Sequence, residues 1–104
     1  MKVHIETVHF KADEKLIDHI ETKLSKLDQF YDRIIDAKVF LKLENSGQVR
    51  DKIAEVILNI PGENIVCKET DKTFEAAINE AEENLKRQLI KRKEKIRKTH
   101  DQSV

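Results

Sequence analysis

The sequence predicts an α+β domain in which a mixed four-stranded sheet carries two helices on one face. Residues 35–43 and 52–60 alternate apolar and polar positions, as half-buried strands do. Two further segments, 14–31 and 74–89, repeat apolar residues at spacings of three and four, which is typical of amphipathic helices. The resulting order, β-α-β-β-β-α, makes the first two strands a parallel pair joined by a crossover and the later strands antiparallel hairpins.

A strand and a helix are expected first. Alternation of Val3, Ile5 and Thr7 with their neighbours predicts a strand over residues 2–8. Asp13 is a suitable N-cap for the helix that follows. One of the two aromatic residues at the end of this helix should be core, which leaves the other open to base stacking. The apolar stripe of the helix comprises Leu16, Ile17, Ile20, Leu24, Leu27 and then Phe30 or Tyr31.

Three strands should follow the helix. A loop is expected at residues 45–47 and a turn at Pro61-Gly62, and the turn leads into a short strand that contains Ile65, Val66 and Cys67. The buried positions of the two longer strands are expected to be Ile35, Ala37, Val39, Leu41 and Leu43 in the first, and Ala54, Val56, Leu58 and Ile60 in the second.

The last helix should be long, because residues 73–98 contain neither glycine nor proline. Either Asp71 or Thr73 could cap it. Beyond Leu89 the apolar stripe fails, so the helix should begin as a core element and end standing clear of the core. The stripe comprises Phe74, Ala77, Ile78, Ala81, Leu85 and Leu89.

Charge is strongly polarised along the chain, although the formal net charge is zero. Residues 1–85 hold 12 Lys and Arg against 18 Asp and Glu, a net charge of −6. Residues 86–104 hold 8 Lys and Arg against 2 Asp and Glu, a net charge of +6. Such polarity favours a directional electrostatic partner.

The basic run is the main functional candidate. Spacing places Arg87, Lys91, Lys95 and Lys98 on one side of a helix, and Lys86, Lys93 and Arg97 on a second side with Ile90 between them. Like charges four residues apart cost a few tenths of a kcal/mol per pair, and a phosphate backbone can compensate for them. A solvated helix end is the plain alternative. Charge alone does not separate RNA from DNA, an acidic protein or an anionic membrane.

Composition argues against an enzyme, a metal site, a cofactor or a membrane protein. The single cysteine, Cys67, excludes an internal disulfide, suits a reducing cytosol and is expected to be a buried, inert thiol. No apolar stretch approaches the roughly 18 residues that span a bilayer, and charges near the N-terminus exclude a signal peptide. The four histidines do not converge, and two glycines cannot build a phosphate-binding loop. The expectation is a cytoplasmic protein without a small-molecule substrate.

Two stretches resemble the ribosome hibernation-promoting factor and ribosome-associated inhibitor family, also called the sigma-factor modulation protein family. Residues 24–34 (LSKLDQFYDRI) are similar to the end of its first helix, and residues 76–79 (AAIN) with 85–95 (LKRQLIKRKEK) to its closing helix. The resemblance spans residues 1–98 and implies a double-stranded-RNA-binding-like fold. Since the chain ends soon after this helix, the short hibernation-promoting form is the closer match.

The resemblance also implies a function, in which one ribosome-binding domain (residues 1–98), followed by a short tail (99–104), occupies the small ribosomal subunit near the decoding centre. There it would block mRNA and tRNA and so inhibit translation, as a monomer when off the ribosome. A protein-interaction module that docks an acidic partner, and a generic double-stranded-RNA binder, remain the alternatives. The matching RNA-binding positions are Lys23, Lys26, Arg87, Lys91, Lys93 and Lys95; charges consistent with the same role are Lys86, Arg92, Arg97 and Lys98.

Overall fold

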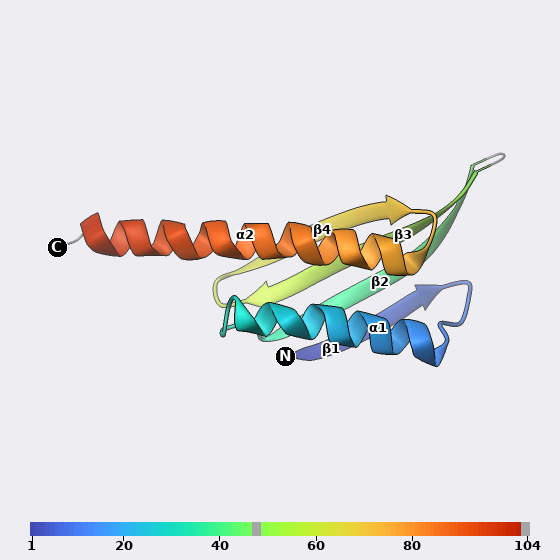
Figure 1. Ribbon diagram of the computed structural model, residues 1–104, viewed down its shortest axis with the longest axis horizontal. Coiled ribbons are helices and arrows are strands. Elements are labelled where there is room, and N and C mark those ends of the chain that lie inside the picture. The colour runs from blue at the N-terminus through green and yellow to red at the C-terminus, as the bar shows by residue number, and fades with distance from the viewer. Residues whose placement is uncertain (47–48, 103–104) are drawn as a thin grey trace.

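The computed structural model describes residues 1–46 and 49–102, with side chains described outside 45–50 and 96–102. The elements follow the predicted order β-α-β-β-β-α, with a 3-10 turn, η1, added after the first helix (Figure 1). Their bounds are β1 Lys2–Val8, α1 Glu14–Ser25, η1 Lys26–Gln29, β2 Asp36–Ser46, β3 Val49–Ile60, β4 Glu63–Asp71 and α2 Phe74–Gln102.

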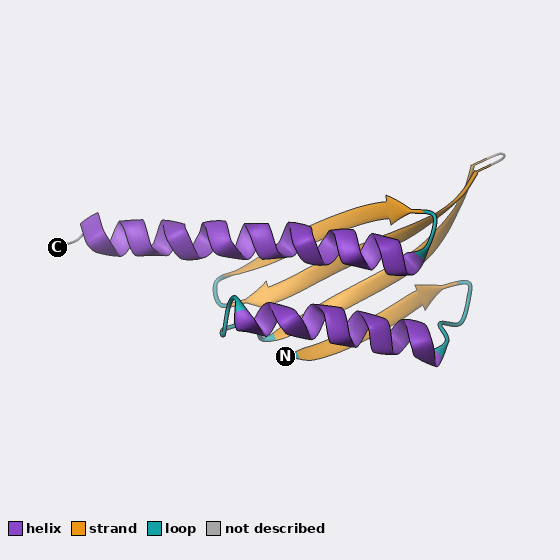
Figure 2. Ribbon diagram, viewed as in Figure 1, coloured by secondary structure: helices purple, strands orange, loops and turns teal. Residues whose placement is uncertain are grey.

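The four strands form one sheet in the order β1-β2-β3-β4. Strand β1 pairs with β2 in parallel, and the two hairpins β2-β3 and β3-β4 are antiparallel. Both helices lie side by side on the same face of the sheet and leave the other face uncovered (Figure 2). The predicted mixed α+β fold is confirmed.

Helix α1 begins where its cap predicts. The side chain of Asp13 accepts a hydrogen bond from the Leu16 backbone N–H at 2.8 Å, which satisfies one of the unpaired donors of the first turn. The expected stripe residues Leu16, Ile20, Leu24 and Leu27 are buried. Ile17, on the edge of the stripe, is only partly buried.

Thr73, rather than Asp71, caps α2. Its hydroxyl accepts a hydrogen bond from the Ala76 backbone N–H at 3.1 Å, whereas Asp71 is the last residue of β4. All six residues of the predicted stripe are buried, and the last of them is Leu89. The helix itself continues to Gln102, four residues past its expected end.

Two predictions about β2 are wrong at its ends. Ile35 is 55% exposed, and Ile34 is buried in its place, because the strand begins only at Asp36 and alternation does not extend back to Ile35. Leu43 is 42% exposed, although it shares the face of Ala37, Val39 and Leu41. The hairpin β2-β3 extends past both helices (Figure 1), so its far end has no helix above it.

The strands also run longer than expected. The loop expected at residues 45–47 is partly strand, since β2 reaches Ser46 and β3 starts at Val49, while Gly47 lies outside the described residues. Strand β4 has nine residues and is longer than the short strand expected around residues 65–67. The turn at Pro61-Gly62 is confirmed, and Gly62 adopts a φ of 88°, which is strained for residues that carry a Cβ.

Candidate nucleic-acid interface

The second half of α2 leaves the sheet. Leu89 is the last buried residue of α2 among its described side chains, and the next apolar residue, Ile90, is 36% exposed. Figure 1 shows the last turns of α2 extending beyond the strands into open space, at the end of the molecule where α1 also finishes. We call residues 86–95 the cationic end of α2; its described basic side chains are Lys86, Arg87, Lys91, Arg92, Lys93 and Lys95.

One side of the cationic end faces the end of α1. The Lys86 Nζ lies 4.5 Å from the centroid of the Phe30 ring, a cation–π contact. Lys93, two helical turns further on, lines a cleft that opens beside Phe30 and Tyr31. Tyr31 is partly buried against the core and Phe30 lies under Lys86, and both residues line the cleft.

The other side of the cationic end faces solvent. Arg87, Lys91 and Lys95 are all exposed. Over the described part of the chain, Arg87, Lys91 and Lys93 form no ion pair with an acidic residue. Their charges are therefore available to an external anion, and the protein does not bury them against its own carboxylates.

Arg92 differs from its neighbours. Its guanidinium pairs with Glu63, the first residue of β4, and its Nε is buried without a hydrogen-bond partner. The turn at Gly62 brings Glu63 under α2, a contact that residues close to Arg92 in the chain do not predict. The pair links α2 to β4. Arg97 and Lys98 lie on α2, but their side chains are outside the described residues.

The two basic residues late in the first helix lie at the same end of the molecule. Lys26 is exposed, at the start of η1. Lys23 forms a 3.8 Å ion pair with Glu82 across the two helices, and this pair and a 3.0 Å hydrogen bond between His19 and Asn79 join α1 to α2. Because both helices run in the same direction (Figure 1), η1, which begins at Lys26, lies at the same end of the molecule as the cationic end.

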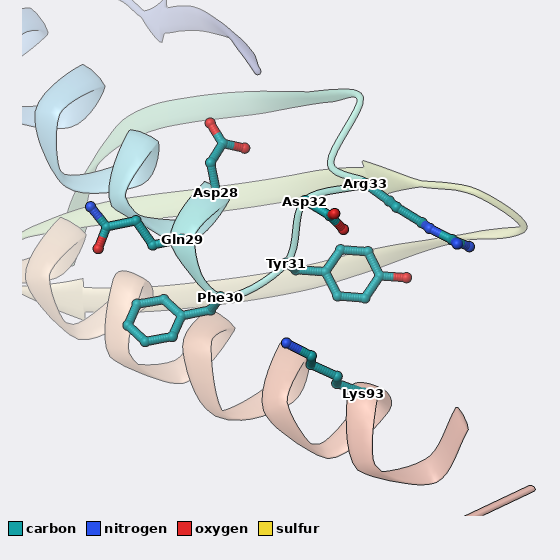
Figure 3. A pocket seen from close by; sticks show the side chains of 7 residues that line it. All are labelled: Asp28, Gln29, Phe30, Tyr31, Asp32, Arg33 and Lys93. Atoms are coloured by element: carbon teal, nitrogen blue, oxygen red, sulfur yellow. The ribbon is translucent and has the colours of Figure 1, made fainter. Parts of the chain in front are cut away.

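A cleft of about 380 Å³ separates the segment after η1 from the cationic end of α2 (Figure 3). Asp28, on its wall, binds the N-terminal ammonium at 3.1 Å, so its charge is already paired. Arg33 is exposed, and a lone arginine after a helix forms no pattern from which a binding residue could be predicted. The lining residues are Asp28, Gln29, Phe30, Tyr31, Asp32, Arg33 and Lys93.

Acidic groups gather at the opposite end of α2. A hydrogen bond shared by the Asp71 and Glu80 carboxyl groups lowers the pKa of Asp71 and raises that of Glu80. Nearby, Glu69 accepts a hydrogen bond from Asn84, whose own side-chain oxygen accepts one from Gln88. Asp71 and Glu80 thus form an acidic pair near the start of α2, away from the cationic end.

The described residues offer little to catalysis or metal binding. They contain no group of three His, Cys, Asp or Glu side chains that could hold a metal ion. Cys67 is buried, as expected, and burial, with a smaller contribution from the charge of Glu69, raises its thiol pKa to about 12. No helix in the described ranges is long and apolar enough to cross a membrane.

Comparisons with known proteins agree with this geometry. The family described as "Sigma 54 modulation protein / S30EA ribosomal protein" matches residues 3–97. Proteins named ribosome hibernation promoting factor are similar: that of Pseudomonas putida is 33% identical over 95 residues, covering 91% of this chain and 89% of its own. That of Escherichia coli K12 is 30% identical over 97 residues, covering 93% and 98%.

Two solved structures share the fold. The crystal structure of the Thermus thermophilus Protein Y N-terminal domain superposes with a TM-score of 0.76 at 28% identity, covering 88% of this chain and 98% of that one. A ribosomal subunit interface protein from Coxiella burnetii gives a TM-score of 0.80 at 18% identity, covering 89% and 98%. At 18% identity, the similarity to the Coxiella burnetii protein shows a shared fold only.

Proposed function

The chain belongs to the sigma 54 modulation protein / S30EA ribosomal protein family of non-enzymatic ribosome hibernation factors, and on that premise we propose that it binds the small ribosomal subunit near the decoding centre. Bound there, it blocks mRNA and tRNA, inhibits translation and preserves idle ribosomes. The single observation that carries the proposal is the cationic end of α2, on which Arg87, Lys91 and Lys93 are exposed and form no ion pair within the described residues.

The mechanism is occupancy rather than chemistry. Lys and Arg side chains contact phosphates of ribosomal RNA, and each neutralised phosphate releases condensed counterions, which drives binding. Specificity comes from the fit of a rigid shape into a preformed RNA channel, because phosphate contacts carry little sequence information. The acidic opposite end of α2 would be repelled by RNA, so the protein enters with its cationic end first.

The ten basic positions divide by their contacts. Lys26, Arg87, Lys91, Lys93 and Lys95 present exposed charge to the RNA. Lys23 and Lys86 add positive charge between the helices, where Lys23 pairs with Glu82 and Lys86 contacts the Phe30 ring. Arg92 reaches RNA only with its remaining donors, since Glu63 engages it. Arg97 and Lys98 extend the same charged helix by one turn.

The remaining features of the proposal follow from the same family. The protein acts in the cytoplasm, under stress and in stationary phase, and is a monomer when it is off the ribosome. Residues 1–98 form the ribosome-binding domain, and residues 99–102 continue α2 beyond it.

Cosedimentation with purified small subunits tests the proposal. The variant Arg87→Glu/Lys91→Glu/Lys95→Glu reverses three exposed charges on one side of α2. A matched control, Lys2→Glu/Lys38→Glu/Lys42→Glu, makes the same charge change on the uncovered face of the sheet, where the pairing register places all three residues. We expect the control to pellet like the wild type, and the α2 variant to stay in the supernatant.

Equal pelleting of the wild type and the α2 variant would refute the cationic end as the binding element. Equal loss in both triple variants would show that net charge alone governs binding, and would also refute it. Survival of a complex in nuclease-treated lysate without enrichment in ribosomal fractions would favour an acidic protein as the partner.

A further inference from the structure

We propose that the cleft between η1 and the cationic end of α2 binds one unpaired nucleotide, with its base against the rings of Phe30 and Tyr31 and its phosphate on Lys93 and Arg33. This inference rests on the proposed function, because it assigns to the cleft a looped-out nucleotide of the RNA that the helix contacts.

The aromatic residues of the chain are few, and their placement selects this cleft. Phe10 and Phe74 stack on each other, with ring centroids 5.0 Å apart. Phe40 lies on the uncovered sheet face, in register with Glu6 and Glu55. The remaining two, Phe30 and Tyr31, both line the cleft at the basic end of the molecule.

Sequence-tolerant recognition of single-stranded RNA combines aromatic rings with cations, because every base has a face that can stack and every nucleotide has a phosphate. The cleft offers both. Figure 3 shows Lys93 reaching from α2 toward the two rings, with Arg33 on the segment that follows Tyr31. Its volume of about 380 Å³ lies at the lower end of the range for small-ligand sites, which suits one nucleotide rather than several.

The acidic residues of the cleft do not oppose this occupant. The N-terminal ammonium neutralises Asp28. The remaining carboxylate, Asp32, is exposed and can accept a hydrogen bond from the amino group of a base, as Asp and Glu do with cytosine. Lys86 covers one face of Phe30 at 4.5 Å, adding a third cation beside the site. The geometry therefore favours a base with an amino group, such as cytosine, over uracil.

Tyr31 supplies a direct readout, since the chain has one tyrosine and no tryptophan. A base stacked on this ring quenches its fluorescence. The test titrates the wild-type protein with hexacytidylate, hexauridylate and a short RNA duplex, with N-acetyltyrosinamide as the correction for light absorbed by the RNA. We expect saturable quenching that is strongest with hexacytidylate and weak with the duplex.

Three variants test where the nucleotide binds. Phe30→Leu keeps the reporter and removes one ring, and should weaken hexacytidylate binding at least about fivefold. Phe40→Leu, the same change on the uncovered sheet face, should leave binding unchanged. Lys93→Gln removes the cation without disturbing packing, since Lys93 is exposed, and should also weaken binding.

Several results would overturn the assignment. They are quenching no greater than that of N-acetyltyrosinamide, equal quenching by the duplex, or equal loss in Phe30→Leu and Phe40→Leu. Equal quenching by hexauridylate would remove the role given to Asp32. Pelleting with small subunits separates this inference from the proposed function: if the wild type pellets but hexacytidylate does not quench Tyr31, the cleft assignment fails alone. If quenching occurs without pelleting, the ribosomal target fails while the nucleotide site stands.

Discussion

The ammonium group of Lys86 lies 4.5 Å from the centre of the Phe30 ring, and this contact joins the start of the cationic end of α2 to the residue that follows η1. Two segments 56 residues apart in the sequence thereby share one surface. The aromatic ring fixes where the positive charge sits, because a cation is attracted to the face of the ring rather than to its edge.

We expect this contact to stabilise the folded protein measurably. A double-mutant cycle with Phe30→Leu and Lys86→Met should give a coupling free energy of about 0.5–1 kcal/mol, the usual range for an exposed cation–π pair. Urea unfolding of the four proteins measures it. A coupling energy indistinguishable from zero would mean that the two side chains only lie near each other.

Because Ile34 lies in the core and Ile35 does not, truncating these two side chains should lower the free energy of unfolding by different amounts. Ile34 is 7% exposed and Ile35 is 55% exposed. Ile34→Ala should therefore lower the free energy of unfolding by about 2–4 kcal/mol through lost burial and a residual cavity. Ile35→Ala should change it by less than about 0.5 kcal/mol. Chemical denaturation of both variants measures the two free energies. A larger loss for Ile35→Ala than for Ile34→Ala would mean that Ile35 is the core residue, as the alternation in the sequence predicts.

Binding to small subunits should weaken steeply with salt. The logarithm of the affinity should fall linearly with the logarithm of the salt concentration, with a slope that increases by about 0.7–0.9 per phosphate contact. Arg87→Gln/Lys91→Gln removes two exposed cations and should reduce the slope by about 1.4–1.8. Filter binding across a salt series measures this. An unchanged slope would show that neither residue contacts phosphate.

Glu63 competes with RNA for Arg92. Glu63→Gln should release the guanidinium, and subunit binding should tighten by a factor of about two to five, the equivalent of a partly exposed ion pair. Pro61→Ala serves as a neighbouring control that leaves both charges in place. If Glu63→Gln instead weakened binding, the ion pair would be required to position α2.

Cys67 should make stability depend on alkaline pH. Its thiol pKa is about 12 in the folded protein against an ordinary value of 9.0. Between these values the unfolded chain loses the thiol proton and the folded chain keeps it, so stability falls as pH rises from about 9 toward 12. The difference in unfolding free energy between wild type and Cys67→Ala, measured at pH 8 and pH 10.5, isolates this effect from the lysines. The same burial should leave the native thiol unreactive toward a disulfide reagent at pH 8.

The cap of α2 shows where local pattern stops being informative. Asp71 and Thr73 are both good N-cap residues, and nothing in their neighbours chooses between them. Strand β4 pairs as far as Asp71, which extends that residue's backbone and leaves Thr73, two residues later, to cap the helix. The pairing of β4 with β3, which involves residues far apart in the chain, therefore selects Thr73 as the cap. The exposure of Leu43 has the same origin, since the length of the helices above the sheet decides which strand positions are covered.

Residue spacing along the chain predicts the element order, the buried stripes of both helices and the location of the positive charge, because each depends on residues close together in the chain. Which cations stay available depends on how the folded elements pack. Packing placed Glu63 beside Arg92, Glu82 beside Lys23 and Phe30 beneath Lys86, while Arg87 and Lys91 point into solvent. The physical reason is that charge pairing depends on distances of a few ångströms between segments far apart in the chain, and folding alone sets those distances.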